Sequence, residues 1–335
     1  MSFSGNEKID DIIKSSEDPI FNITSNINNS QNDLVDITQD YEEIIEDIIS
    51  KPKDIIGLST GFDKWDQLIG GGLRPGSVNV LAARTKCGKS MVTLNVAYNM
   101  AKSNIPVLYL DSEMTKRTQL MRLISLHTKI PISEIETGQF SKNPDKLKLV
   151  KDSYNILSKY PITHCDISGQ SINNILSIAR RWLIRKVGFT NNKANTCLIC
   201  YDYIKLMDVA DVTGSLKEYQ LLGFLLGSIH DFSIKYELPV FATVQLNREH
   251  DIAQSDRIEW LCSTMSLLKD KLPEDLAEDN IINGNKKLLI KHTRFGPGLD
   301  QCDYINMKAD FATSSIKEGE IHSHVVQFEK NQNEE

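Results

Sequence analysis

Short apolar runs rich in β-branched residues alternate with longer stretches in which apolar residues recur every three or four positions. The short runs predict buried strands, and the longer stretches predict helices that pack against them. We expect strands at Ser77–Ala82, Pro106–Asp111, Ile162–Asp166, Thr196–Tyr201 and Pro239–Gln245. We expect helices at Ser90–Lys102, Thr115–His127, Asp145–Tyr160, Ile172–Val187 and Glu218–Tyr236. The alternation predicts an α/β fold with a mostly parallel, twisted sheet flanked by helices.

Four shorter apolar runs follow toward the C-terminus, without long helical stretches between them. They are Met265–Leu268, Lys287–Thr293, Asp303–Lys308 and Val325–Phe328. Strands joined by short connections pair antiparallel, so we expect these four to close one edge of the sheet. Residues 53–330 therefore form one predicted domain, and residues 331–335 form a short polar tail.

The chain before residue 53 has a different pattern. Residues 1–37 are rich in Asn, Ser and acidic residues without a sustained period, which predicts a disordered leader. Residues 38–52 carry apolar side chains at helical spacing and end at a proline, which predicts a short helix. Its apolar residues are Tyr41, Ile44, Ile45, Ile48 and Ile49. A stripe of this width has to pack against another surface, either its own domain or a second subunit.

Charge and composition narrow the class of protein. The formal net charge of −7 is concentrated in residues 1–54, which hold 13 Asp and Glu against 4 Lys and Arg. The rest of the chain is nearly neutral, which permits a local basic channel for phosphates. No apolar run approaches the roughly 18 residues that a membrane span needs, and the first residues lack a signal-peptide pattern. We therefore expect a cytoplasmic protein that does not enter a membrane.

The six cysteines fit the same compartment. Cys197 and Cys200 form a C-x-x-C pair, a spacing that occurs in redox and metal sites. No second Cys or His pair stands at zinc-like spacing, and the pair lies in an expected strand, where residues three apart face opposite sides. We interpret both cysteines as buried, reduced thiols.

Residues 83–90 read Ala-Arg-Thr-Lys-Cys-Gly-Lys-Ser and match the phosphate-binding loop G-x-x-x-x-G-K-[ST] except at the first position. The expected strand before this loop and helix after it would aim backbone N–H groups at phosphates. Lys89 is expected to bind the β- and γ-phosphates, and the Ser90 hydroxyl to bind Mg²⁺. The alternative is an ordinary turn with an exposed lysine. The predicted nucleotide-contacting residues are Ala83, Arg84, Thr85, Lys86, Cys87, Gly88, Lys89, Ser90 and Met91.

Polar side chains also stand at the ends of other expected strands. Glu113, just after the second strand, is a candidate for the base that activates water, with Asp111 as the alternative. Asp202 ends the fourth strand and is a candidate Mg²⁺ ligand. Gln245 ends the fifth strand and either senses the γ-phosphate or is an ordinary strand-end amide. The carboxyl ends of parallel strands meet at one edge of a sheet, which predicts a shared crevice.

These motifs, in this order, resemble the ATPase domain of the DnaB-like hexameric replicative helicases, which implies a RecA-like P-loop NTPase core. The resemblance rests on the loop at 83–90, Asp-Ser-Glu-Met at 111–114, Tyr-Asp-Tyr-Ile-Lys-Leu-Met at 201–207 and Gln-Leu-Asn-Arg at 245–248. It extends to Leu-Ser-Thr-Gly-Phe-Asp at 58–63, Thr-Gly-Gln at 137–139 and Lys-His-Thr-Arg-Phe-Gly-Pro at 291–297. It covers about residues 38–310.

The resemblance implies a hexameric ring that moves 5′ to 3′ on single-stranded DNA, driven by ATP with Mg²⁺. It implies a primase or a helicase loader as a partner and, for a phage-type protein, the host cytoplasm as its location. The helix at residues 38–52 would dock on the adjacent subunit, and Arg294 would reach that subunit's nucleotide. The implied catalytic residues are Glu113, Lys89, Arg294 and Gln245, the implied metal ligands Ser90 and Asp202, and the implied DNA contacts Arg248, Ser255 and Arg257.

Several features depart from the family pattern. We expect no counterpart in residues 1–52 of the helical domain that precedes the ATPase domain in the family. His292 stands where the family has a lysine two residues before the finger arginine, with Lys291 beside it. The loop at 247–260 looks short and contains Glu249, Asp251 and Asp256. Residues 70–77, Gly-Gly-Gly-Leu-Arg-Pro-Gly-Ser, also resemble KaiC-like and RadA-like ATPases, so the alternative function is a recombination or regulatory ATPase without unwinding activity.

Overall fold

The structure, a computed structural model, describes residues 36–204, 218–246, 260–279, 283–300 and 302–323. The chain forms two compact units, Met1–Asp54 and Ile55–Glu335. Most of the predicted leader at 1–37 and all of the tail at 331–335 lie outside the described residues. None of the helices in the described ranges has the length and apolar character that a membrane span requires.

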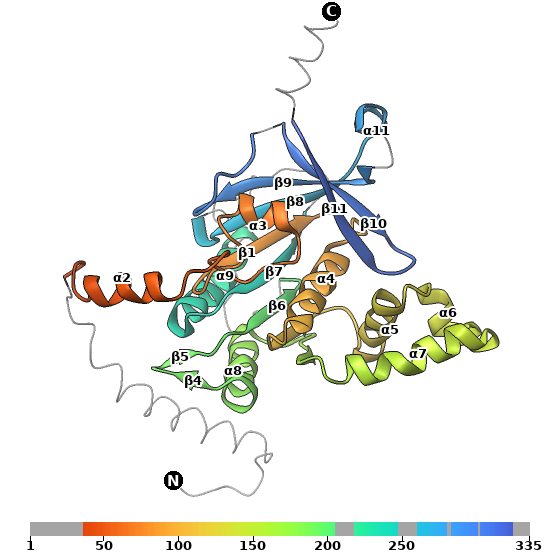
Figure 1. Cartoon of the computed structure of the whole chain (residues 1–335), viewed down its shortest axis with the longest axis horizontal. Coiled ribbons are helices and arrows are strands. Elements are labelled where there is room, and N and C mark those ends of the chain that lie inside the picture. Colours follow the sequence, from red (N-terminus) through yellow and green to blue (C-terminus); the bar gives the residue numbers. More distant parts are fainter. Residues whose placement is uncertain (1–35, 205–217, 247–259, 280–282, 301, 324–335) are drawn as a thin grey trace, which may run out of the picture. The chain divides into compact units, whose positions relative to one another are not determined.

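A nine-stranded sheet forms the centre of the second unit, in the order β11-β10-β9-β8-β1-β7-β6-β2-β3 (Figure 1). Its parallel strands are β8 (Thr264–Asp270), β1 (Val78–Ala83), β7 (Val240–Gln245), β6 (Leu198–Asp202), β2 (Val107–Asp111) and β3 (Ile162–Asp166). The antiparallel strands that extend it beyond β8 are β9 (Lys286–Thr293), β10 (Tyr304–Asp310) and β11 (Ser315–His322). The predicted α/β fold with a mostly parallel sheet is confirmed.

Two strands at this edge differ from the prediction. The predicted antiparallel strand at Met265–Leu268 does pair antiparallel with β9, but it pairs parallel with β1, so β8 belongs to the parallel part of the sheet and the antiparallel part begins with β9. A parallel neighbour requires a crossover connection, and the chain between β7 and β8 is long enough to supply one. The outermost strand, β11, was not predicted, because its two isoleucines are separated by charged residues and a glycine. The run Val325–Phe328 lies outside the described residues.

The predicted helices are present, with ends shifted by a few residues. They are α4 (Lys89–Lys102), α5 (Lys116–Thr128), α7 (Pro144–Leu157), α8 (Ile172–Trp182) and α9 (Glu218–Tyr236). The smaller elements are α3 (Asp63–Leu68), α6 (Ile132–Thr137), η1 (Gln139–Lys142), η2 (Leu183–Val187), the hairpin β4 (Phe189–Thr190) with β5 (Lys193–Ala194), and α11 (Pro273–Asp279). Helices α5, α6 and α7 lie together to one side of the sheet (Figure 1).

Side-chain caps explain where three of these helices begin. The Thr115, Asn143 and Ser171 side chains accept hydrogen bonds from backbone N–H groups in the first turns of α5, α7 and α8. Such caps satisfy donors that have no partner within the helix, and each contributes about 1 kcal/mol. The local sequence therefore sets these helix starts.

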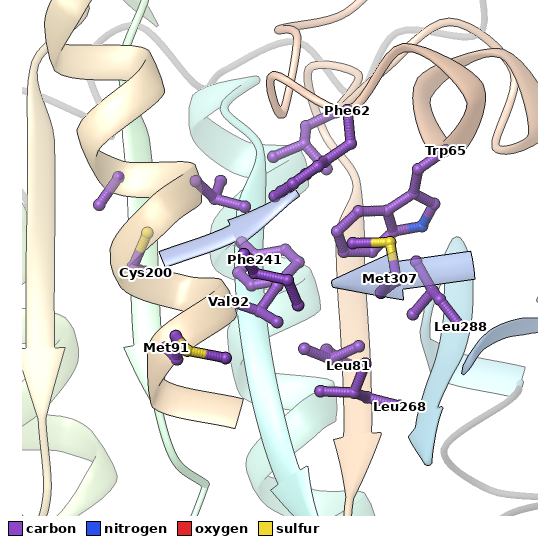
Figure 2. Packing of buried hydrophobic residues seen from close by; sticks show 14 of the residues in the cluster. Phe62, Trp65, Leu81, Met91, Val92, Cys200, Phe241, Leu268, Leu288 and Met307 are labelled. Atoms are coloured by element: carbon purple, nitrogen blue, oxygen red, sulfur yellow. The ribbon is translucent and has the colours of Figure 1, made fainter. Parts of the chain in front are cut away.

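The main core lies between the sheet, α4 and the turn that carries α3. Trp65 packs edge-on against Phe241 at a ring-centroid distance of 5.9 Å, and Phe62 packs against Trp65 (Figure 2). The Trp65 indole also donates a hydrogen bond of 3.0 Å to Ser266 Oγ on β8. Met91 and Val92 of α4 belong to the same buried cluster (Figure 2), and fully burying such a side chain contributes about 1.5–3 kcal/mol, so this core holds α4 on the sheet.

Helix α2 (Tyr41–Ser50) belongs to the first unit and lies within the predicted range 38–52. Its apolar stripe is exposed, with 63% of Tyr41, 60% of Ile48 and 72% of Ile49 accessible to solvent. An exposed stripe of this kind marks a surface suited to binding another apolar surface.

A close contact between two glycine turns holds the segment around Arg294. The backbone of Gly70, at φ +93°, lies so near Phe295 that a Cβ at Gly70 would be 2.5 Å from the Phe295 carbonyl carbon. A Cβ at Gly296 would be 2.0 Å from the Leu68 carbonyl oxygen. The Arg74 guanidinium lies 4.6 Å from the centroid of the Phe295 ring. Only glycine fits at both positions, which accounts for Gly70 and Gly296.

We expect Gly70→Ala to destabilise the fold more than Gly169→Ala. Both glycines have positive φ, which costs an alanine about 1–2 kcal/mol, but a Cβ at Gly169 meets nothing within 4 Å. The clash at Gly70 should add about 1–3 kcal/mol of overpacking. Denaturant unfolding of both variants measures the difference. Equal losses for the two would show that the contact with Phe295 is not tight.

Candidate active site

The predicted site residues gather at the carboxyl ends of neighbouring parallel strands. Strands β1, β7, β6 and β2 lie side by side, and the register pairs Ala83 with Gln245 and Asp111 with Asp202. The phosphate-binding loop leaves β1 at this edge, and Glu113 follows β2 there. Parallel strands in this order open a crevice at their carboxyl ends, where ligands bind in α/β proteins.

The loop at 84–88 joins β1 directly to α4. Gly88 precedes the helix at φ 115°, a backbone conformation that only glycine adopts readily. Cys87 is buried, and its Sγ lies 3.3 Å from the Leu268 carbonyl oxygen. Burial raises the pKa of the Cys87 thiol to about 11. The loop is thus anchored on β8, while Arg84, Thr85 and Lys86 are exposed.

Ala83 occupies the position where the loop pattern has its first glycine. It is the last residue of β1, so its backbone is extended, a conformation that does not require glycine. Its side chain is fully buried. The turn begins one residue later, with the Cys87 N–H donating to the Arg84 carbonyl oxygen at 3.2 Å. The substitution is therefore compatible with the loop.

Lys89 is buried, with 7% of its surface exposed, which contradicts the alternative of an ordinary turn with an exposed lysine. Burial lowers the pKa of Lys89, and the nearby carboxylates of Asp202 and Glu113 oppose that shift. Its Nζ lies 5.3 Å from the centroid of the Tyr203 ring. A buried ammonium needs a compensating negative charge, which the nearby acids supply here and a bound phosphate could supply as well.

Asp202 is the most enclosed acid of the site, with 2% of its surface exposed. Its carboxylate accepts hydrogen bonds from Tyr109 Oη and Thr243 Oγ1, both at 2.8 Å, and from the Ser90 hydroxyl. Burial raises the pKa of Asp202, so a nearby cation would favour its charged form. Carboxylate and hydroxyl oxygens are the donors that Mg²⁺ prefers, so Asp202 and Ser90 fit a magnesium site.

The two acids near the end of β2 have different environments. Glu113 is exposed, and its side chain hydrogen bonds with Tyr203. Asp111 is fully buried, and its carboxylate accepts four hydrogen bonds. Of the two, only Glu113 is accessible to solvent.

Gln245 is the exposed last residue of β7, beside the phosphate-binding loop. The following residue ties the two strands together, with the Leu246 N–H donating to the Ala83 carbonyl oxygen at 3.0 Å. This position is suited to contact with a bound nucleotide. A cavity of about 330 Å³ opens beside the loop, lined in part by Arg84, Cys87, Leu246 and Lys269.

Arg294 lies at the opposite end of the strands from the phosphate-binding loop. Because β9 runs antiparallel to β8, its last residue lies beside the start of β8, and the Arg294 N–H donates to the Ser263 carbonyl oxygen at 2.8 Å. Ser263 in turn bonds to Val78, the first residue of β1. About 17 Å of strand separates that end of β1 from the phosphate-binding loop. The fold therefore does not bring Arg294 to the site of its own chain.

Comparison with known proteins places these features in a family. The family model for the DnaB-like helicase C-terminal domain matches residues 57–261, more than half of the chain. The chain belongs to this family. It is 27% identical over 319 residues to the replicative DNA helicase DnaB of Pasteurella multocida, covering 87% of this chain and 63% of that protein. It is 29% identical over 289 residues to a probable replicative DNA helicase of Trieres chinensis, covering 84% and 60%.

Two solved structures share the fold of this DnaB-like chain. One is an isolated ATPase domain, which superposes with a TM-score of 0.73 at 20% identity and covers 86% of this chain and 100% of that one. The other is a DnaB-like replicative helicase studied with primase, which superposes with a TM-score of 0.70 at 18% identity, covering 91% and 71%. The predicted RecA-like core is therefore confirmed. The chain spans just over 60% of the length of its Pasteurella relative.

Several residues of the DnaB-like site were not predicted, and some predicted residues lie outside the described part of the chain. Tyr203 contacts both Lys89 and Glu113, and Tyr109 and Thr243 hold Asp202. An aromatic residue directly after a strand-end aspartate was the available signal for Tyr203. The predicted DNA contacts Arg248, Ser255 and Arg257 lie outside the described residues.

The cysteine pair and the lysine replacement can be placed in the DnaB-like fold. Cys197 and Cys200 are both buried, and neither forms a disulfide. Burial raises the pKa of Cys197 to about 12.

Near the finger position, Lys291 and Arg294 are exposed, whereas His292 is half-buried. Lys291 is thus the more accessible cation beside Arg294.

Proposed function

We propose that this chain is an ATP-hydrolysing DNA helicase that forms a ring and moves 5′ to 3′ on single-stranded DNA. One observation carries the proposal. Lys89, Ser90, Asp202 and Glu113 converge at one edge of the sheet in a chain of the DnaB-like family. This is the set of groups that phosphoryl transfer to water requires, namely a phosphate clamp, metal ligands and a base.

ATP would bind with its phosphates along the loop at 83–91. Lys89 neutralises the β- and γ-phosphates, and the first backbone N–H groups of α4 add donors with no partner within the helix. Ser90 and Asp202 would hold Mg²⁺, which neutralises charge on the phosphates when bound. The cavity beside Arg84 and Lys269 is large enough to take part of the nucleoside.

Glu113 would act as the base that orients and deprotonates the attacking water. Its exposure to solvent supports this role, and its hydrogen bond with Tyr203 connects it to the segment that follows Asp202. Asp111 is unsuited because both of its oxygens already accept hydrogen bonds in a buried setting. Gln245, on the strand between β1 and β6, would sense the γ-phosphate and pass the signal to the chain that follows it.

A ring explains the position of Arg294. The residue is exposed and lies about 17 Å of strand away from the loop of its own chain, so it can serve only a neighbour's nucleotide. A cyclic arrangement of about six copies would give every site one such arginine. Arg248, Ser255 and Arg257 would contact the backbone of the DNA strand, and a primase or loader would be the protein partner.

The deciding experiment measures ATP hydrolysis with and without single-stranded DNA, then strand displacement on 5′- and 3′-tailed forks. We expect DNA to stimulate hydrolysis and the 5′-tailed fork alone to be unwound. Filament formation on DNA without unwinding would favour a recombination ATPase. Hydrolysis indifferent to DNA would favour a regulatory ATPase.

We also propose that α2 docks on the adjacent subunit and holds the ring together. Its exposed apolar stripe supports this role, since leaving several isoleucines in water forfeits about 1.5–3 kcal/mol each. A variant that begins at Asp54 should keep its fold and nucleotide binding but run as a monomer or loose oligomer in light scattering. Its ATP hydrolysis should collapse, because Arg294 would lose its target.

Point variants of the full chain separate docking from simple loss of sequence. Ile44→Asp with Ile48→Asp places charge on the stripe and should disrupt the ring, whereas Glu46→Gln on the polar face should not. Stable rings from the variant that begins at Asp54 would show that the core interface suffices without the helix.

A further inference from the structure

The buried carboxylate of Asp111 holds the turn that carries Glu113. Asp111 Oδ1 accepts hydrogen bonds from the Glu113 N–H at 3.0 Å and the Met114 N–H at 2.7 Å. The residue itself is fully buried at the end of β2. Two backbone bonds to one rigid acceptor fix the path of the chain at Glu113.

The other oxygen of Asp111 is fixed by two further elements. Oδ2 accepts a hydrogen bond from Gln119 Nε2 on α5 at 2.6 Å and lies 3.3 Å from His164 Nε2 on β3. His164 stacks on Tyr109, whose hydroxyl donates to Asp202. Burial alone would raise the pKa of Asp111, but hydrogen bonds from His164, Gln119 and the backbone have the larger combined effect. The pKa of Asp111 is therefore lowered, and the carboxylate stays charged.

These contacts converge on the turn that carries Glu113, whose side chain is exposed. Ser112, between the two acids, bonds through its N–H to the Asp202 carbonyl oxygen at 2.8 Å. Its Oγ also accepts from the Tyr203 N–H at 3.1 Å. Asp111 therefore joins the β2 turn to β3 and α5, while Ser112 joins it to β6.

We infer that Asp111, held by Gln119 and His164, is a positioning residue that sets where the Glu113 carboxylate lies relative to the bound nucleotide. The inference rests on the proposed role of Glu113 as the base. Asp111 does not face the reacting atoms, and it acts only through the Glu113 turn. Displacing a reacting group by about 1 Å can cost about 100-fold in rate, which sets the scale of the effect.

The test compares Asp111→Ala and Asp111→Asn in the full chain with single-stranded DNA. Asp111→Ala should lower kcat by up to about 100-fold and leave KM and the Kd for a non-hydrolysable ATP analogue unchanged. Asp111→Asn should restore most of kcat, because its Oδ1 still accepts from the Glu113 and Met114 N–H groups. Within the described residues, Gln119 Oε1 is buried without a partner, so the Gln119 amide can turn over to accept from the new Asn.

Asp166→Ala is the matched control. Asp166 ends β3 opposite Asp111 and likewise accepts a backbone N–H, from Ser168 at 2.9 Å, but the hydrogen bonds of its carboxylate go to Ser168 and not to the backbone of Glu113 or Met114. Its kcat should equal that of the natural chain. If Asp111→Ala fails to fold, Gln119→Leu removes one side-chain donor and should lower kcat by a smaller factor with the same unchanged Kd.

The outcomes separate this inference from the proposed function. An inactive Glu113→Gln variant beside an Asp111→Ala variant of normal kcat would overturn the positioning role alone. An Asp111→Ala variant that loses nucleotide affinity and thermal stability together, without rescue by Asn, would show a purely structural role and also overturn it. A fully active Glu113→Gln variant would overturn both ideas.

Discussion

Lys89→Ala and Glu113→Gln are both expected to abolish ATP turnover, but with opposite effects on nucleotide binding. Removing Lys89 deletes the buried ammonium that would bind the phosphates and leaves Asp202 and Glu113 without their cation, so binding should fall as well. Glu113→Gln keeps the size of the side chain and loses only the base, a change that typically costs about 10²–10⁴ in rate. ATP should therefore bind to Glu113→Gln and persist unhydrolysed.

Filter binding of labelled ATP and single-turnover hydrolysis measure the two effects separately. Lys102→Ala is the matched control for Lys89, because it removes a lysine from the far end of the same helix, away from the crevice. It should bind and hydrolyse ATP normally. Normal hydrolysis by Glu113→Gln would remove Glu113 from the site, and normal binding by Lys89→Ala would remove Lys89.

Arg294→Ala is expected to inactivate the ring but to be rescued by mixing. An arginine delivered across a subunit boundary can contribute about 10³–10⁵ in rate in GTPases, so the pure variant should hydrolyse ATP very slowly. Its own Lys89 and Glu113 remain intact. Beside a Lys89→Ala subunit, which keeps Arg294, it should regain activity, and a series of mixing ratios measured by ATP hydrolysis should pass through a maximum.

Lys308→Ala on β10 removes another exposed cation and serves as the control, with no loss expected. Mixed rings have to be shown directly, for example by co-purification through two different tags. If confirmed mixed rings show no recovery at any ratio, Arg294 does not act across a boundary.

Much of the site could be predicted because its signals are local. An apolar strand, a Gly-Lys-Ser turn and a helix lie within one short stretch, and the structure has β1, the loop at 84–88 and α4 there, with Lys89 as the first residue of the helix. Asp202 and Gln245 end apolar runs of their own, and parallel packing then aligns the strand ends. Hydrophobic periodicity and capping residues depend on neighbours in sequence, so they can be recognised without knowledge of the fold.

The remaining features depend on contacts between residues far apart in the chain. The direction of β8 is determined by its pairing with β1, and the formation of β11 by its pairing with β10. Neither pairing produces a strong pattern in the local sequence. The sequence favoured Glu113 over Asp111 as the base, but it did not show that Asp111 is buried and hydrogen bonded to Gln119 and His164, which lie on other elements. Arg294 could be picked out from the sequence, but its distance from the phosphate-binding loop could not. That distance follows from the antiparallel pairing of β9 with β8, because strand pairing determines which strand ends lie next to each other.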